Sequence, residues 1–168
     1  TFHDEHGREE PEQHLVAAIL RPGNVPATLG AEGLLRRLVA RLRRAFPDTP
    51  LRARLDGGYA AGEFLDVLED LGLEYLVNMP SNERLKALVE PLMAGLVRPM
   101  SAEEGHTWHA YGDLAYAAKS WRCERRVVVK AEVARDPGRP ERDGRDNARF
   151  VVTNMKQDPQ WLYEEGYC

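Results

Sequence analysis

Short apolar runs alternate with amphipathic helical patterns between residues 14 and 96, and this alternation constrains the fold more than any other feature. The apolar runs have the length and composition typical of buried strands. In the stretches between them, leucine and valine recur at helical spacing, which places them on one face of a helix. Strands that alternate with helices favour an α/β fold with parallel pairing. The predicted order is strand 14–21, helix 31–46, strand 51–55, helix 64–71, strand 73–79 and helix 81–96, with Ser81 as the cap of the last helix.

The helical period disappears after residue 98, where the sequence becomes typical of β-structure. We predict a β pair at 114–121 and 126–133, a loop rich in Pro, Gly and charge at 134–149, and a strand at 150–153. A last helix begins near Pro159, with Trp161 and Leu162 facing inward. The predicted organisation is an α/β core formed by 1–98 and 149–168, interrupted by a β-rich insertion at 99–148.

Composition places the chain among globular proteins, with 43% hydrophobic and 30% charged residues in a length of 168. The longest apolar run, Leu15 to Leu20, is too short to cross a membrane. Two cysteines far apart in the sequence suit a reducing compartment and indicate a cytoplasmic location. The apolar runs therefore exclude a membrane span, and the cysteines argue against a disulfide scaffold.

The formal net charge of −4 argues at first against a nucleic-acid partner. Local balances differ from this average. Residues 31–56 hold 7 basic against 3 acidic side chains, and residues 119–149 hold 10 against 6. Because binding responds to the local field, the acidic total does not exclude DNA.

Asp56 stands at the carboxyl end of a predicted strand and is followed by two glycines. This is a common place for a ligand-binding or metal-binding residue, and glycines allow a phosphate or a metal to approach the backbone. The alternative is that Asp56 begins a turn or caps the next helix. Position alone leaves both interpretations open.

Several segments of the sequence occur in the order seen in one enzyme family. The segment around Asp56, followed by a helix and a strand, resembles the second-aspartate segment of the DDE transposases of bacterial insertion sequences, of the group-1 DDE-domain type. Four further patches fall in the same order, which makes the resemblance specific. The matching residues are 20–24 (LRPGN), 51–60 (LRARLDGGYA) with 74–77 (EYLV), 116–121 (YAAKSW) with 124–126 (ERR), 149–154 (RFVVTN), and 162–164 (LYE) with Tyr167 and Cys168.

The resemblance implies an RNase H-like fold, a mixed sheet flanked by helices. It also implies that three acidic residues bind two divalent ions, Mg²⁺ or Mn²⁺, which support in-line attack on a DNA phosphodiester. Such a metal pair stabilises the charge that gathers on the attacking and leaving oxygens, and hard carboxylate oxygens are suitable ligands. Asp56 would be the second of the three carboxylates.

The departures from the family pattern concern the other two carboxylates. The first aspartate belongs upstream of anything that aligns here, and Asp4 falls in a non-catalytic segment. The third acid belongs to a helix signature whose tyrosine matches Tyr167, and the chain ends before its glutamate. We therefore expect a fragment with one of three metal ligands that does not cleave DNA by itself. The alternatives are a non-catalytic DNA-binding or assembly remnant and an unrelated α/β metal-dependent hydrolase.

The expected partners are DNA, at the transposon ends and the target, and a second copy of the intact protein. Each exposed arginine that contacts a phosphate adds salt-sensitive affinity, and an aromatic ring can stack on a base. The alternatives are a solvated helix face for the arginines of 31–46 and a packing role for the tryptophan. The candidate DNA-binding residues are Arg37, Arg41, Arg44, Lys119, Trp121, Arg125, Arg126 and Tyr167.

Overall fold

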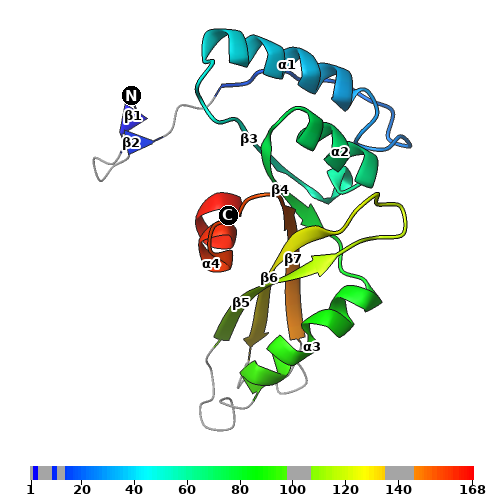
Figure 1. Ribbon diagram of the computed structural model, residues 1–168, viewed down its shortest axis with the longest axis vertical. Coiled ribbons are helices and arrows are strands. Elements are labelled where there is room, and N and C mark those ends of the chain that lie inside the picture. Colours follow the sequence, from blue (N-terminus) through cyan, green and yellow to red (C-terminus); the bar gives the residue numbers. More distant parts are fainter. Residues whose placement is uncertain (1, 4–8, 11–13, 98–106, 135–145) are drawn as a thin grey trace.

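The computed structural model describes residues 2–3, 9–10, 14–97, 107–134 and 146–168, and its main element is a five-stranded sheet (Figure 1). The strand order is β3-β4-β7-β6-β5. β3 and β4 are parallel, whereas the other neighbours are antiparallel, so the expected mixed α/β fold is confirmed. The strands are β3 (Arg52–Leu55), β4 (Glu74–Met79), β5 (Thr107–Tyr116), β6 (Arg125–Ala134) and β7 (Asp146–Thr153), and β1 (Phe2–His3) pairs with β2 (Glu9–Glu10) in a separate sheet.

The helices begin and end at residues with identifiable local roles. α2 ends at Asp70 and is followed by Gly72, whose positive φ of 61° is a conformation that glycine adopts without strain. Asn82, and not the predicted Ser81, caps α3, because its Oδ1 accepts the Leu85 N–H at 3.0 Å. Asp158 likewise caps α4. The helices are α1 (Ala31–Ala45), α2 (Gly62–Asp70), α3 (Glu83–Val97) and α4 (Pro159–Trp161), which continues as a π-helical segment (Leu162–Tyr167).

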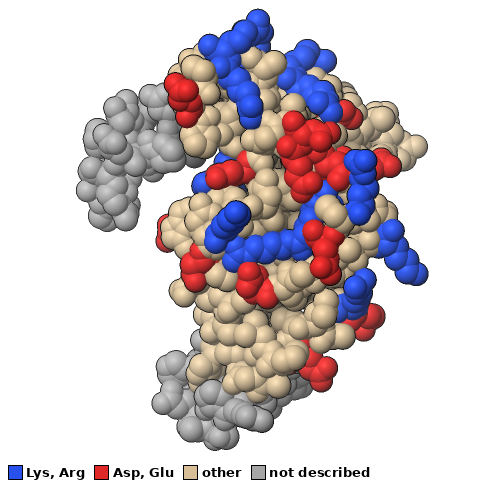
Figure 2. Space-filling model, viewed as in Figure 1, with Lys and Arg blue, Asp and Glu red and all other residues tan. Residues whose placement is uncertain are grey.

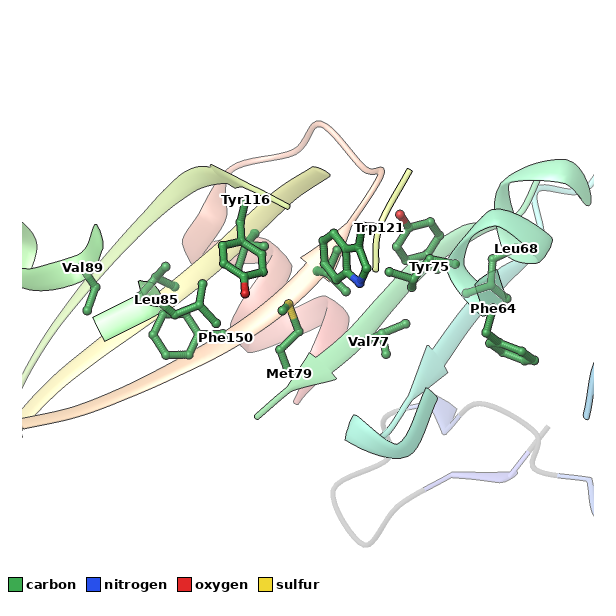
Figure 3. Close-up of a cluster of buried hydrophobic side chains, with 14 of the residues drawn as sticks. Phe64, Leu68, Tyr75, Val77, Met79, Leu85, Val89, Tyr116, Trp121 and Phe150 are labelled. Carbon is green, nitrogen blue, oxygen red and sulfur yellow. The ribbon is translucent and has the colours of Figure 1, made fainter. Parts of the chain in front are cut away.

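Helices cover both faces of the sheet. On one face, side chains of α1, α2 and α3 pack against the sheet, as Figure 3 shows for Leu68 and Leu85 around Tyr75 and Phe150. On the other face, Leu162 and Tyr163 of the π-helical segment pack against the central strands. Because successive residues of a strand point to opposite faces, each strand contributes to both clusters.

The predicted strand at 14–21 is wrong. Residues 14–20 have no regular secondary structure, and Leu15 and Leu20 are 87% and 101% exposed. A strand requires backbone hydrogen bonds to a neighbouring strand, and neither sheet of the described residues includes this segment. Trp161 was also expected to face inward, but it is 41% exposed and lies beneath the guanidinium of Arg52.

The predicted β pair continues the core sheet. β5 and β6 pair over ten residues each, earlier and longer than predicted for the first strand, and β6 pairs with β7. The division into a core and an insertion at 99–148 stays a prediction. Most of the predicted loop at 134–149 lies outside the described residues.

Candidate active site

Asp56 directly follows β3 and is exposed. Its backbone remains extended, and its Oδ1 accepts the N–H of Gly58 at 2.9 Å. Asp56 therefore caps the 3₁₀ turn at Gly57–Tyr59, which agrees with the alternative interpretation that Asp56 begins a turn. One oxygen used in this way leaves the carboxylate exposed and able to bind a cation. The predicted strand-end position of Asp56 is confirmed.

Arg54 connects the Asp56 side of β3 to α4 and its π-helical continuation, which together (159–167) we call the C-terminal helix. Residues 54 and 56 lie on the same face of the strand, about 6–7 Å apart along it. The Arg54 Nη1 donates to the backbone oxygens of Tyr167 and Cys168, each at 2.9 Å. Tyr167 itself is packed against Tyr163, with ring centroids 5.8 Å apart. The two matched segments that carry Asp56 and Tyr167, 111 residues apart in the sequence, thus meet at one face of the sheet.

The Arg21 side chain holds the loop at 22–29 next to the Asp56 turn. It donates to the backbone oxygens of Ala27 and Leu29 and, at 3.2 Å, to the hydroxyl of Tyr59. A Cβ on Gly58 would lie only 2.9 Å from the Cβ of Ala27. Gly58 therefore allows a close approach between this loop and the turn that Asp56 caps.

The arginines of α1 form an exposed basic surface. Arg37 and Arg41 are exposed, and within the described residues neither has a hydrogen bond or an ion pair. Arg44 is exposed and donates to a backbone oxygen of its own helix. Figure 2 shows the basic side chains gathered at the top of the view, over α1, with acidic side chains below them over α2. We call Arg37, Arg41 and Arg44 the α1 arginine face.

Trp121 and Arg125 do not have surfaces available to DNA. Trp121 is buried, with its ring edge-on to Tyr116 and 5.4 Å from the guanidinium of Arg125 (Figure 3). Arg125 donates to Asp66 at 2.5 Å and to Glu69 at 2.7 and 2.9 Å, and its side chain is 3% exposed. Their expected role in DNA binding is therefore corrected to a structural one, since a buried guanidinium cannot reach a phosphate.

Arg126 points to the opposite face of β6 and is also engaged. It donates to Asp113 at 2.6 Å and to the backbone oxygens of Met155 and Gln157 at 2.9 Å each. These bonds join β5, β6 and the segment after β7. Arg126 is partly exposed, so its role in DNA binding stays a prediction. Lys119 is exposed and stays a candidate.

The acidic residues that bind Arg125, Asp66 and Glu69, are partly exposed and were not predicted as a site. The hydrogen bond from Arg125 lowers the pKa of Glu69, against the opposing effect of burial. Burial raises the pKa of Tyr75, whose hydroxyl donates to Glu69 at 2.7 Å. One signal in the sequence could have indicated this cluster. Residues 61–74 hold five acidic and no basic side chains, so any basic residue that pairs with them must come from another segment.

The described residues contain no group of three His, Cys, Asp or Glu side chains that could hold a metal ion. Asp56 supplies one hard oxygen donor, a type of ligand that fits Mg²⁺ or Mn²⁺. A complete two-ion site needs further carboxylates. Asp56 is therefore compatible with a metal site as one of its ligands.

The comparisons with known proteins identify the family. The model of the family described as transposase DDE domain group 1 matches residues 6–168. The chain belongs to this family. The match includes Asp56, the loop held by Arg21 and the C-terminal helix with Tyr167, so one family model covers the segments that meet beside β3. Searches of curated proteins and of solved structures found no match.

Membership in the DDE transposase family supports a transposase-type function and implies DNA as the substrate and divalent metals as the usual cofactor. Within the described residues, none of the helices has the length and apolar character needed to span a membrane.

Proposed function

We propose that Asp56 is a catalytic, metal-ligating carboxylate in DNA phosphodiester cleavage and strand transfer by the intact protein. The observation that carries the proposal is the position of Asp56, exposed at the end of β3 on the face where Arg54 holds the C-terminal helix. The family match supports it. Carboxyl ends of strands in open α/β sheets are common ligand sites.

Bound Mg²⁺ or Mn²⁺ would supply electrostatic stabilisation of the phosphate oxygens during in-line attack. The chain's own part is to hold a carboxylate at the strand end and to fix its orientation. The Gly58 N–H restricts the Asp56 side chain, and the loop held by Arg21 restricts the turn. Tyr167, at the helix end that Arg54 holds, is proposed to help position a DNA phosphate.

The purified chain is expected not to cleave supercoiled DNA in the presence of Mg²⁺. A single carboxylate at this position binds a hydrated divalent ion weakly, because most of the ligands must come from elsewhere. Conversion of supercoiled plasmid to nicked or linear forms measures this directly. Mg²⁺-dependent cleavage that disappears in Asp56→Ala would contradict the expectation that the metal site is incomplete.

A second candidate function is a non-catalytic DNA-binding or assembly module that keeps the fold and the phosphate contacts only. The α1 arginine face favours it, since exposed arginines without acidic partners suit a DNA backbone. The gene sequence on either side of the segment that encodes this chain distinguishes the two functions. An acidic residue upstream, with arginine and glutamate soon after Tyr167, would support the enzyme, and a frameshift or stop codon would support the remnant.

Replacing Arg37, Arg41 and Arg44 by glutamine is expected to weaken duplex DNA binding and to reduce its salt dependence. Each lost phosphate contact lowers the slope of log K against log salt concentration by about 0.9. Fluorescence anisotropy at several salt concentrations measures the slope. The control variant replaces three exposed cations elsewhere on the chain by glutamine and changes the net charge by the same amount. These residues are Arg52, Lys86 and Lys156. Equal slopes for the two triple variants would rule out the α1 arginine face as the contact surface.

We further propose that the intact protein acts as a dimer on paired DNA ends and is located in the cytoplasm, associated with the nucleoid. The absence of disulfide-like cysteine spacing supports the location, and the exposed Cys123 and Cys168 agree with it.

A further inference from the structure

Asn78 is next to Asp56 at the carboxyl ends of two neighbouring parallel strands. The register of β3 and β4 pairs Leu55 with Val77, so continuing it by one residue brings Asp56 beside Asn78. Neighbouring strands lie about 4.8 Å apart. A Cβ placed on Gly57 would lie 3.7 Å from the backbone oxygen of Asn78 and 3.9 Å from its Nδ2, which confirms that the amide is close to the turn.

The side chains of Asn78 and Asp56 belong to the same face of the sheet. Leu76, two residues before Asn78, packs against Leu162 and Tyr163 of the C-terminal helix. Arg54, two residues before Asp56, binds the end of that same helix. Because residues two apart on a strand share a face, Asn78 and Asp56 both lie on the side where the C-terminal helix packs.

The amide of Asn78 has no structural partner within the described residues, although it is partly buried. Two other asparagines, after β4 and after β7, use their amides to hold the fold. Asn82 donates to the hydroxyl of Tyr116 at 3.0 Å, and Asn154 donates to the backbone oxygen of Leu73 at 2.8 Å. Asn78 thus has a partly exposed amide whose N–H groups are unused. It lies next to the Asp56 carboxylate, which has no N–H or O–H group to donate when it is ionised.

We propose that Asn78 is a substrate-facing residue of the Asp56 site, and that its Nδ2 donates a hydrogen bond to a phosphate oxygen of the bound DNA strand. This inference rests on the proposed function of Asp56. A carboxylate holds a cation but repels the phosphate, so a neighbouring neutral donor contributes an attraction that Asp56 cannot. The amide adds this donor without competing for the metal as a second negative charge.

The first test measures where Asn78 lies relative to the metal. Asn78→Asp adds a carboxylate beside Asp56, and we expect it to tighten Mn²⁺ binding about tenfold, as judged by the electron paramagnetic resonance signal of free Mn²⁺. Asn82→Asp is the matched control, because it adds the same charge four residues further along the chain, after β4, and can still cap α3. Equal Mn²⁺ affinities for the two variants would overturn the placement.

The second test measures the contact with phosphate. Asn78→Leu keeps the size of the side chain and removes the donor. The quantity measured is the factor by which Mn²⁺ increases the affinity of the protein for a short DNA duplex. This factor should be about tenfold smaller in Asn78→Leu than in the wild type. Its Mn²⁺ affinity without DNA should stay at the wild-type value. An unchanged DNA gain would overturn the proposal for Asn78. A wild-type Mn²⁺ affinity that is unaffected by Asp56→Asn would instead contradict the proposed function, and circular dichroism verifies that each variant is folded.

Discussion

Replacing Arg125 by methionine is expected to lower the free energy of unfolding by about 3–5 kcal/mol. Arg125 is 3% exposed in its side chain and neutralises both Asp66 and Glu69 of α2. The apolar replacement fills much of the same space but removes the buried cation from both carboxylates, which keep only exposed Arg122 and the Tyr75 hydroxyl as partners. It also removes the cation that lies over the ring of Trp121.

Urea unfolding at neutral pH measures this loss. The matched control is Arg122→Ala, because Arg122 also pairs with Asp66 but is 79% exposed, and an exposed ion pair contributes less than about 1 kcal/mol. A similar loss in both variants would show that burial of the Arg125 guanidinium is not what stabilises the fold. Among the residues that the structure describes, the buried Nη1 atom of Arg125 has no hydrogen-bond partner, so methionine also relieves one unfavourable group. A result at the lower end of the range is therefore consistent with the structure.

Gly62→Ala is expected to lower the free energy of unfolding by about 1–3 kcal/mol, although alanine is normally the better helix former. Gly62 is the first residue of α2 and lies against the turn that precedes β6. An added Cβ would lie 2.7 Å from Cδ1 of Trp121 and 3.0 Å from the backbone oxygen of Ser120. Both contacts are too close, and a backbone atom cannot move aside as a flexible side chain can.

Gly33→Ala in α1 is the control for Gly62→Ala. Its Cβ would meet only the end of the Arg37 side chain, at 3.6 Å, so the helix propensity of alanine should raise the stability by about 0.5–1 kcal/mol. Thermal or urea unfolding gives the two changes with opposite signs. A stabilising effect of Gly62→Ala would contradict the close packing of α2 against Trp121.

Local sequence pattern was sufficient to predict the helix and the strand that precede Asp56. The helix at 31–46 and the strand at 51–55 agree with α1 and β3 to within about a residue, because the periodicity of buried side chains sets them. The position of Asp56 followed from the same pattern. A polar residue directly after an alternating strand and before two glycines marks the end of that strand.

The apolar run at 14–21 shows where local pattern is insufficient. A strand depends on a partner that can lie anywhere in the sequence, and an apolar run indicates only that burial would be favourable. The structure shows no strand at 14–20, and the run is irregular and exposed. The sequence alone did not contain this non-local information.

The positive charge of Arg125 and Arg126 was similarly ambiguous. A basic residue in a strand can face solvent or a buried acid, and the two neighbours here point to opposite faces, each toward its own carboxylate. The five acids without a base at 61–74 could have indicated the first pairing. The proximity of Asn78 to Asp56 required the register of β3 and β4, which no local pattern determines.

The most direct test of the proposed metal role of Asp56 is paramagnetic broadening of backbone amide signals by Mn²⁺ in two-dimensional ¹⁵N spectra. The Gly57 and Gly58 amides should broaden first in the wild type and in Asp48→Asn, a control that removes one exposed carboxylate from another turn. In Asp56→Asn, which keeps an oxygen to accept the Gly58 N–H, this selective broadening should disappear. Broadening at Gly57 and Gly58 that persists in Asp56→Asn, or that is absent from the wild type, would contradict the assignment of Asp56 as a metal ligand.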